Sequence, residues 1–142
     1  MTDIFDQFDA LEESYEFMLA YAAQGLPTDK GSQSGRQIRE FLERALHSIS
    51  GIVTWCIDGG EPKAFEPRDK YLPFRQVFER DARNALAAIE LVLAQPAIGS
   101  QLVDNLNASI HLRATLTDMF LVSDILRHQL GETMPVELTA ED

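Results

Sequence analysis

The stretch of sequence that decides the fold class is DIFDQFDALEESYEFMLAYAAQ, residues 3–24. Its apolar residues recur in alternating steps of four and three, the spacing of one stripe along an α-helix. The acidic residues fall on the opposite face. Gly25 and Pro27 favour a helix end directly after the stretch. The sequence therefore predicts an amphipathic helix here, with an apolar stripe of Ile4, Phe8, Leu11, Tyr15, Met18 and Ala22.

Three further stretches show helical spacing, and segments rich in Gly, Pro and polar residues separate them. They predict helices over residues 35–57, 69–95 and 100–130, with Pro73 tolerated in or before the first turn of its helix. No stretch alternates with period two for long enough to predict a strand. A chain of 142 residues suits one domain, and short connections favour antiparallel neighbours. We therefore predict an all-α, up-down-up-down antiparallel four-helix bundle over residues 1–131, followed by an acidic C-terminal tail over residues 132–142. The loops at residues 26–34 and 96–99 then share one end of the bundle.

The last predicted helix is apolar on more than one side. Val103, Leu106 and Ile110 form one stripe, and a second stripe lies about a third of a turn away, at about 100° per residue. Two interpretations stay open: a kinked helix with a wide buried face, or a helix held between its own bundle and another molecule. The second stripe consists of Leu112, Leu116, Met119, Leu126 and Leu130.

The extra apolar positions favour binding to another protein. The first helix carries a second seam in which small residues precede aromatic ones, a pattern that permits close helix approach. Leu91 extends the apolar surface of the third helix. The leading interpretation is a non-enzymatic accessory or adaptor protein that forms a homodimer or binds a partner through its helix faces. The interface candidates are Ala10, Ser14, Phe17, Tyr21, Leu91, Leu112, Leu116 and Met119.

An alternative function rests on polar residues of the last helix. Arg113, Thr117, Asp124 and His128 extend the stripe that begins at Val103. If this polar track points inward, its charges require partners, and the bundle then holds a polar or anionic ligand or a metal. If instead the helix turns its core face midway, the four side chains lie in water.

His47 is the third feature. It lies opposite the apolar stripe of its helix and four residues after Glu43, a pair that favours surface ion pairing over metal binding. The chain contains no Glu-x-x-His pair of the ferritin-like kind. The segment HSISG, residues 47–51, resembles the His-x-Leu-Lys-Gly element of histidine phosphotransfer domains, although Ser50 stands in the place of the Lys. The resemblance implies an exposed histidine that accepts a phosphoryl group.

Composition excludes several classes of function. The formal net charge is −11, and no Lys/Arg cluster suits nucleic acid or an anionic membrane. Cys56 is the one cysteine and lies on an apolar stripe, where a thiol is inert. The Gly-rich residues 28–36 lack the ending of a P-loop. We predict a cytoplasmic protein without catalytic residues, cofactor or metal, whose partner is another protein or a second copy of itself.

Overall fold

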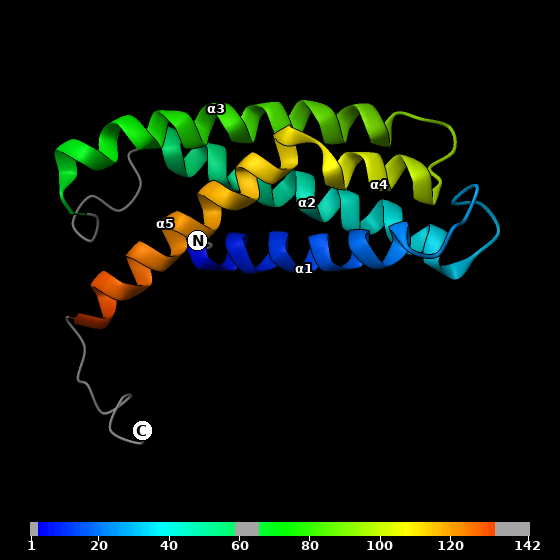
Figure 1. Ribbon diagram of the computed structural model, residues 1–142, viewed down its shortest axis with the longest axis horizontal. Helices are drawn as coiled ribbons and strands as arrows, with labels where there is room; N and C mark the ends of the chain where they lie inside the picture. The colour runs from blue at the N-terminus through cyan, green and yellow to red at the C-terminus, as the bar shows by residue number, and fades with distance from the viewer. Residues whose placement is uncertain (1–2, 59–65, 133–142) are drawn as a thin grey trace, which may run out of the picture.

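The computed structural model describes residues 3–58 and 66–132, so the predictions for residues 59–65 and 133–142 lie outside it. The described residues form five helices and no strand, which confirms the all-α prediction (Figure 1). The helices are α1 (Ile4–Ala22), α2 (Gln33–Ile57), α3 (Arg68–Leu93), α4 (Ser100–Ala108) and α5 (Ile110–Glu132).

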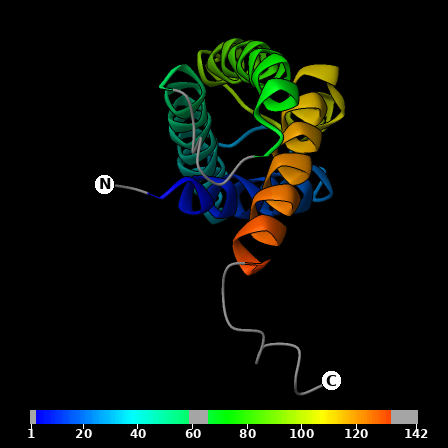
Figure 2. The same cartoon turned by 90° about the vertical axis from the view of Figure 1, so that its left-hand side faces the viewer.

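The helices pack in a bundle-like arrangement. Helices α1 to α4 run in alternating directions (Figure 1), and α2 lies between α1 and α3 (Figure 2). The remaining side of the bundle is shared, because α4 packs mainly against α1 whereas α5 packs mainly against α3. Across the described residues, no helix combines the length and the apolarity needed to cross a membrane.

The predicted apolar stripes of the first three helices form the core. Residues three and four apart lie on one helix face, so each stripe points at its neighbours. Ser32 starts α2 as an N-cap, because its Oγ accepts a hydrogen bond from the backbone N–H of Gly35 at 2.9 Å. Pro73 lies inside α3, beyond the first turn in which it was predicted, and is exposed. The largest fully buried side chains of these helices include Phe8, Leu11, Met18, Ile38, Leu42, Ile49, Phe78 and Ile89.

The prediction of one continuous helix over residues 100–130 is wrong, because Ser109 separates α4 from α5. Ser109 adopts extended backbone angles, with φ −65° and ψ 145°. Its Oγ accepts a hydrogen bond from the backbone N–H of Leu112 at 3.3 Å and so starts α5. The buried side chain of Asn107 donates to the carbonyl oxygen of Met18 at 3.1 Å, which ties the end of α4 to α1. The change of apolar face in the last predicted helix thus coincides with a break between two helices.

The two short loops meet at one end of the bundle, as predicted, and we call this the closed end. The backbone N–H of Ser100 donates to the carbonyl oxygen of Leu26 at 2.8 Å. The buried carboxylate of Asp29 accepts from the backbone N–H of Ile98 and from Nε of Arg39, each at 2.7 Å. Arg39 also donates to the carbonyl oxygens of Leu93 and Gln95. One acidic side chain thus joins both loops to α2.

Buried hydroxyl groups complete the closed end. Tyr21 is fully buried, and its hydroxyl donates to the carbonyl oxygen of Ile98 at 2.7 Å. The hydroxyl of Ser100 donates to the carbonyl oxygen of Tyr21 and accepts from the backbone N–H of Leu26. Gly35 packs directly on this loop, since a Cβ there would lie 1.7 Å from the carbonyl oxygen of Asp29. The closed end therefore holds its polar groups in hydrogen bonds and leaves no space at Gly35.

Candidate functional site

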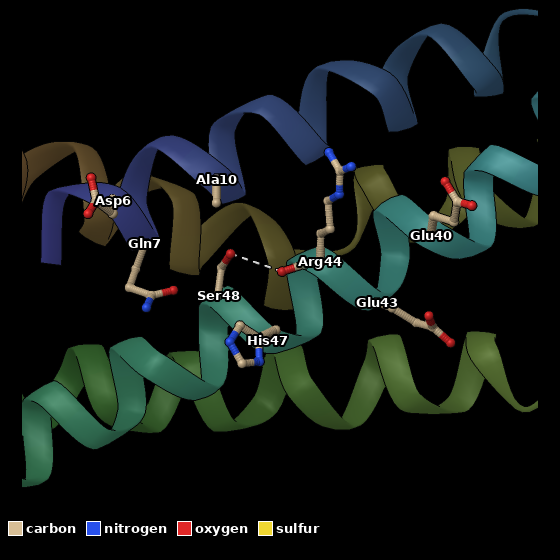
Figure 3. Close-up of a pocket in the computed structure, with 8 residues that line it drawn as sticks. All are labelled: Asp6, Gln7, Ala10, Glu40, Glu43, Arg44, His47 and Ser48. Atoms are coloured by element: carbon tan, nitrogen blue, oxygen red, sulfur yellow. Dashed lines mark hydrogen bonds between the residues drawn. The ribbon is translucent and has the colours of Figure 1, made fainter. Parts of the chain in front are cut away.

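A groove between α1 and α2 gathers charged side chains and the histidine singled out by the sequence (Figure 3). It encloses about 460 Å³. We call it the α1–α2 groove. Most of its lining residues come from the outward side of α2, opposite the core positions Leu42, Ala45 and Ile49. The lining residues are Asp6, Gln7 and Ala10 of α1 and Glu40, Glu43, Arg44, His47 and Ser48 of α2.

Small side chains make the groove possible. Ala10 leaves α1 without a long side chain at this point, and Ser48 does the same for α2. The hydroxyl of Ser48 donates to the carbonyl oxygen of Arg44 at 2.9 Å, so it bonds within its own helix (Figure 3). The hollow therefore follows from residue size at two positions that face each other across the helix pair.

A second, open groove of about 590 Å³ runs along the outer side of α1 and shares Asp6 and Ala10 with the first. Its lining adds four carboxylates of α1, and α1 contains no Lys or Arg. One basic contact reaches this side, because Arg127 of α5 lies 3.6 Å from Asp9. The two grooves together form what we call the acidic surface, with the carboxylates of Asp6, Asp9, Glu12, Glu13, Glu16, Glu40 and Glu43.

An aromatic pair lies beside the acidic surface. The rings of Phe17 and Phe41 stack with their centroids 4.3 Å apart and join α1 to α2. The guanidinium of Arg44 lies over the Phe41 ring, 4.7 Å from its centroid. Stacking over an aromatic ring fixes a guanidinium without a carboxylate partner. Arg44 thus lines the α1–α2 groove while its guanidinium contacts the Phe41 ring, and the carboxylates of the acidic surface outnumber the basic groups that line it.

The prediction that His47 is exposed is confirmed. The glycine that follows one turn later, Gly51, has a packing role, because a Cβ there would lie 2.8 Å from Cδ of Gln7. The Gln7 side chain thus occupies the space that Gly51 leaves open. Asp6, Glu40 and Glu43 line the same groove as His47, so an incoming phosphoryl group meets three carboxylates and one guanidinium.

The interface residues predicted from the sequence divide into two groups. Leu91 is exposed, with 67% of its surface accessible, whereas Ala10 and Phe17 are half-buried in or beside the α1–α2 groove. The other five are buried inside the chain and cannot contact a partner. For the three residues on α5 the reason is that this helix starts at Ile110 and packs its apolar face mainly against α3, whereas the two on α1 face the bundle interior. The five buried residues are Ser14, Tyr21, Leu112, Leu116 and Met119.

The inward-facing polar track is not formed. Arg113, Thr117, Asp124 and His128 are all exposed. At about 100° per residue they share one face of α5, and it is the face opposite Leu112 and Met119. Their charges therefore need no buried partners, and they do not line a cavity in the bundle.

Two buried titratable groups lie elsewhere in the core. Burial raises the pKa of the Cys56 thiol to about 12, so the thiol stays protonated and inert, as predicted. Burial, together with a hydrogen bond to the Asp81 carboxylate of α3, raises the pKa of Asp118 to about 8, although Arg80 opposes the shift. Sequence reasoning missed Asp118, since its position on α5 could be assigned to the buried face only after the break at Ser109 was known.

The described residues contain no group of three or more His, Cys, Asp or Glu side chains placed to hold a metal ion. Comparison with protein-family models, curated proteins and solved structures found no match to this chain. The acidic surface could have been anticipated in part, because the carboxylates of residues 3–24 fall on one face. The grooves within it depend on how α1 and α2 pack.

Proposed function

We propose that this protein is a non-enzymatic accessory protein that binds a basic segment of another protein on its acidic surface. The observation that supports this most directly is the continuity of the two grooves across α1 and α2 through Asp6 and Ala10. Carboxylates predominate in both grooves, and the walls of a groove focus the electric field of such charges more than a flat surface does.

Electrostatics favours a Lys- or Arg-containing partner. The carboxylates of Glu12, Glu13 and Glu16 are exposed on a helix without bases, in a chain of net charge −11. Complementary charge increases the rate of encounter and selects against acidic partners. Binding of this kind weakens as salt rises, since exposed charges are screened over about 10 Å at 0.1 M ionic strength.

The aromatic pair supplies apolar contact area beside these charges. Phe17 and Phe41 are both half-buried, so part of each ring stays accessible. The aliphatic stems of Lys and Arg pack on such surfaces while their charged ends reach carboxylates. Arg44 and His47 limit the most acidic part of the surface to α1, where we place the strongest contacts.

Site-specific photo-crosslinking in the source cells tests this proposal. A photoreactive residue replacing Gln7 at the edge of the α1–α2 groove should capture a defined set of proteins with basic segments. The double substitution Glu13→Lys and Glu16→Lys should abolish that capture. Glu90→Lys, on the exposed side of α3, introduces the same kind of charge change away from the acidic surface and should preserve it. Equal capture in all three backgrounds, or no capture, contradicts the proposal.

A second candidate function is phosphotransfer at His47, and the exposure of this histidine on a bundle helix favours it. Arg44 lines the same groove and can contact a phosphoryl oxygen. Incubation with phosphoramidate followed by intact-protein mass spectrometry tests it. An acid-labile phosphoryl group that is lost in His47→Gln and kept in His111→Gln, another exposed histidine, supports the function. Absence of the group, or its retention in His47→Gln, contradicts it.

A further inference from the structure

An apolar groove lies between the start of α3 and the second half of α5, and it shares no lining residue with the acidic surface. It encloses about 160 Å³. Its floor and walls are Tyr71 and Phe74 of α3 and Leu121, Val122 and Ile125 of α5. Leu121 forms one edge and has 50% of its surface accessible. We call this hollow the α3–α5 groove.

The groove is built on fixed elements. The side-chain amide of Gln129 on α5 accepts from the backbone N–H of Glu66 at 3.1 Å and donates to the carbonyl oxygen of the same residue. This pair of bonds ties the chain that begins α3 to the end of α5. Tyr71 is buried and packs edge-on against Trp55 of α2, with ring centroids 6.3 Å apart. An apolar partner therefore meets a preformed surface and needs little rearrangement.

We propose that the α3–α5 groove is the interface of a homodimer, in which Leu121 of each copy enters the groove of the other around a two-fold axis. A two-fold interface requires one patch that is complementary to itself. This patch contains both a projecting side chain and a groove that can receive it. The half-exposed Leu121 lies directly beside a hollow lined by Tyr71 and Phe74.

The charges at the rim fit the same arrangement. Glu66 and Lys70 line the groove, one of each sign. In a two-fold pair, residue i of one copy meets residue j of the other and the reverse, so Lys70 can face Glu66 of the second copy twice. In the proposed dimer the rim thus supplies two opposite-charge pairs.

Charge disfavours a self-contact through α1. Two copies that met through α1 would oppose carboxylates such as Asp6 and Glu13 without any base on that helix. Like charges placed together at an interface are strongly unfavourable. The α3–α5 groove and the α1–α2 groove have no lining residue in common, so an interface at the first leaves the second accessible. The dimer therefore displays two acidic surfaces, which strengthens binding to a partner with two basic segments by raising the effective concentration.

Analytical ultracentrifugation of the full chain over a wide concentration range tests the interface. The wild-type chain should be a dimer at micromolar concentration, and Leu121→Glu should be a monomer with an unchanged helical circular-dichroism spectrum. Leu91→Glu is the matched control, because it places the same charge on an exposed leucine of α3 outside the groove. It should stay dimeric.

A charge swap gives a second, independent readout. Lys70→Glu should weaken the dimer at least tenfold at low salt, because Glu66 of the other copy then faces a carboxylate. Adding Glu66→Lys to the same chain should restore the dimer, since both pairs are again of opposite sign. If Lys70→Glu weakened the dimer only by destabilising the fold, adding Glu66→Lys would not restore the dimer.

Three results would overturn the inference. A wild-type monomer at all concentrations is the first, and loss of the dimer in Leu91→Glu but not in Leu121→Glu is the second. The third is a monomer that dimerises only when residues 133–142 are removed, which would assign the groove to the chain's own C-terminal segment. None of these results affects capture of a basic partner at the acidic surface, so failure of the dimer and failure of the proposed function are distinguishable.

Discussion

The closed end and the α5 end of this molecule are held together in different ways. At the closed end, buried Asp29, Tyr21 and Ser100 make hydrogen bonds of 2.6 to 2.9 Å that link both loops. At the other end, α5 reaches α1 through exposed Arg127, whose guanidinium lies 3.6 Å from Asp9 and 4.3 Å from the Phe5 ring centroid. Buried polar contacts are costly to break, whereas exposed ones contribute little. We therefore expect the contacts of the closed end to contribute more to the free energy of unfolding than the contact between Arg127 and α1.

The largest effect should come from Gly35→Ala at the closed end. The new Cβ would overlap the backbone carbonyl of Asp29, and backbone cannot move aside as a side chain can. We expect a loss of about 3 kcal/mol in the free energy of unfolding, measured by urea denaturation. Gly131→Ala in α5 is the control, because nothing lies within 4 Å of its Cβ. It should be neutral or stabilising by up to about 1 kcal/mol.

Asp29→Asn should have the next largest effect, a loss of about 2 kcal/mol at neutral pH, because it removes a charge-assisted hydrogen bond from Arg39. Burial alone would raise the pKa of Asp29, but the bonds from Arg39 and Ile98 outweigh it and hold that pKa below 3.8. The stabilisation is therefore present above pH 3.8 and is lost as pH falls through the lower, folded-state pKa. Denaturation curves of wild type and variant should converge in acid. Asp104→Asn, an exposed change, should match wild type throughout.

Asp118 lies where α5 packs against α3, and Asp118→Asn should change the pH dependence of the free energy of unfolding. The folded-state pKa of about 8 lies above the ordinary value of 3.8, so the protonated carboxyl stabilises the fold fully below pH 3.8. That contribution is lost as pH rises through about 8, where a second negative charge forms beside Asp81. The variant should therefore be more stable than wild type at pH 9, by an amount of order 1 kcal/mol. If the difference in unfolding free energy between variant and wild type were the same at pH 5 and pH 9, the raised pKa of Asp118 would be contradicted. Asp124→Asn, on the exposed face of α5, is the control.

Arg127→Ala should have the smallest effect, a loss below about 1 kcal/mol, because its ion pair and its cation–π contact are both exposed. Amide hydrogen exchange should become faster in the last turns of α5. Exchange rates at the closed end should not change. Arg113→Ala, also exposed on α5, is the control and should leave exchange unchanged. Faster exchange at Tyr21 or Ile98 in Arg127→Ala would show that the two ends are coupled.

Local sequence signals were sufficient for most of the helices. The steps of four and three from Ile4 to Ala22 identify the buried face of α1, and those of α2 and α3 do so equally well. In the last predicted helix, the sequence showed that the apolar stripe shifts between Leu106 and Leu112. It did not show that the helix breaks there. Asn107 and Ser109, two residues that favour helix ends over helix interiors, are the signal that could have located the break.

The functional surfaces were less predictable. Ser14 and Tyr21 looked like a second seam of α1 because helical spacing alone does not say how wide the buried face is. Their burial follows from contacts with residues far along the chain, such as the bond from Tyr21 to Ile98. In the same way, Leu121 lines a groove only together with Tyr71 and Phe74, which lie on another helix.

By itself the sequence determined the helical class, the apolar faces of α1, α2 and α3, the acidic face of α1 and the exposure of His47. These properties depend on residues within one or two turns of each other, and helical periodicity reports such relations directly. Tertiary structure alone decided the rotation of α5 after Ser109, the hydrogen bonds of Asp29, the raised pKa of Asp118 and the three grooves. Each of these depends on distances between side chains on different helices, which the packing of the bundle sets.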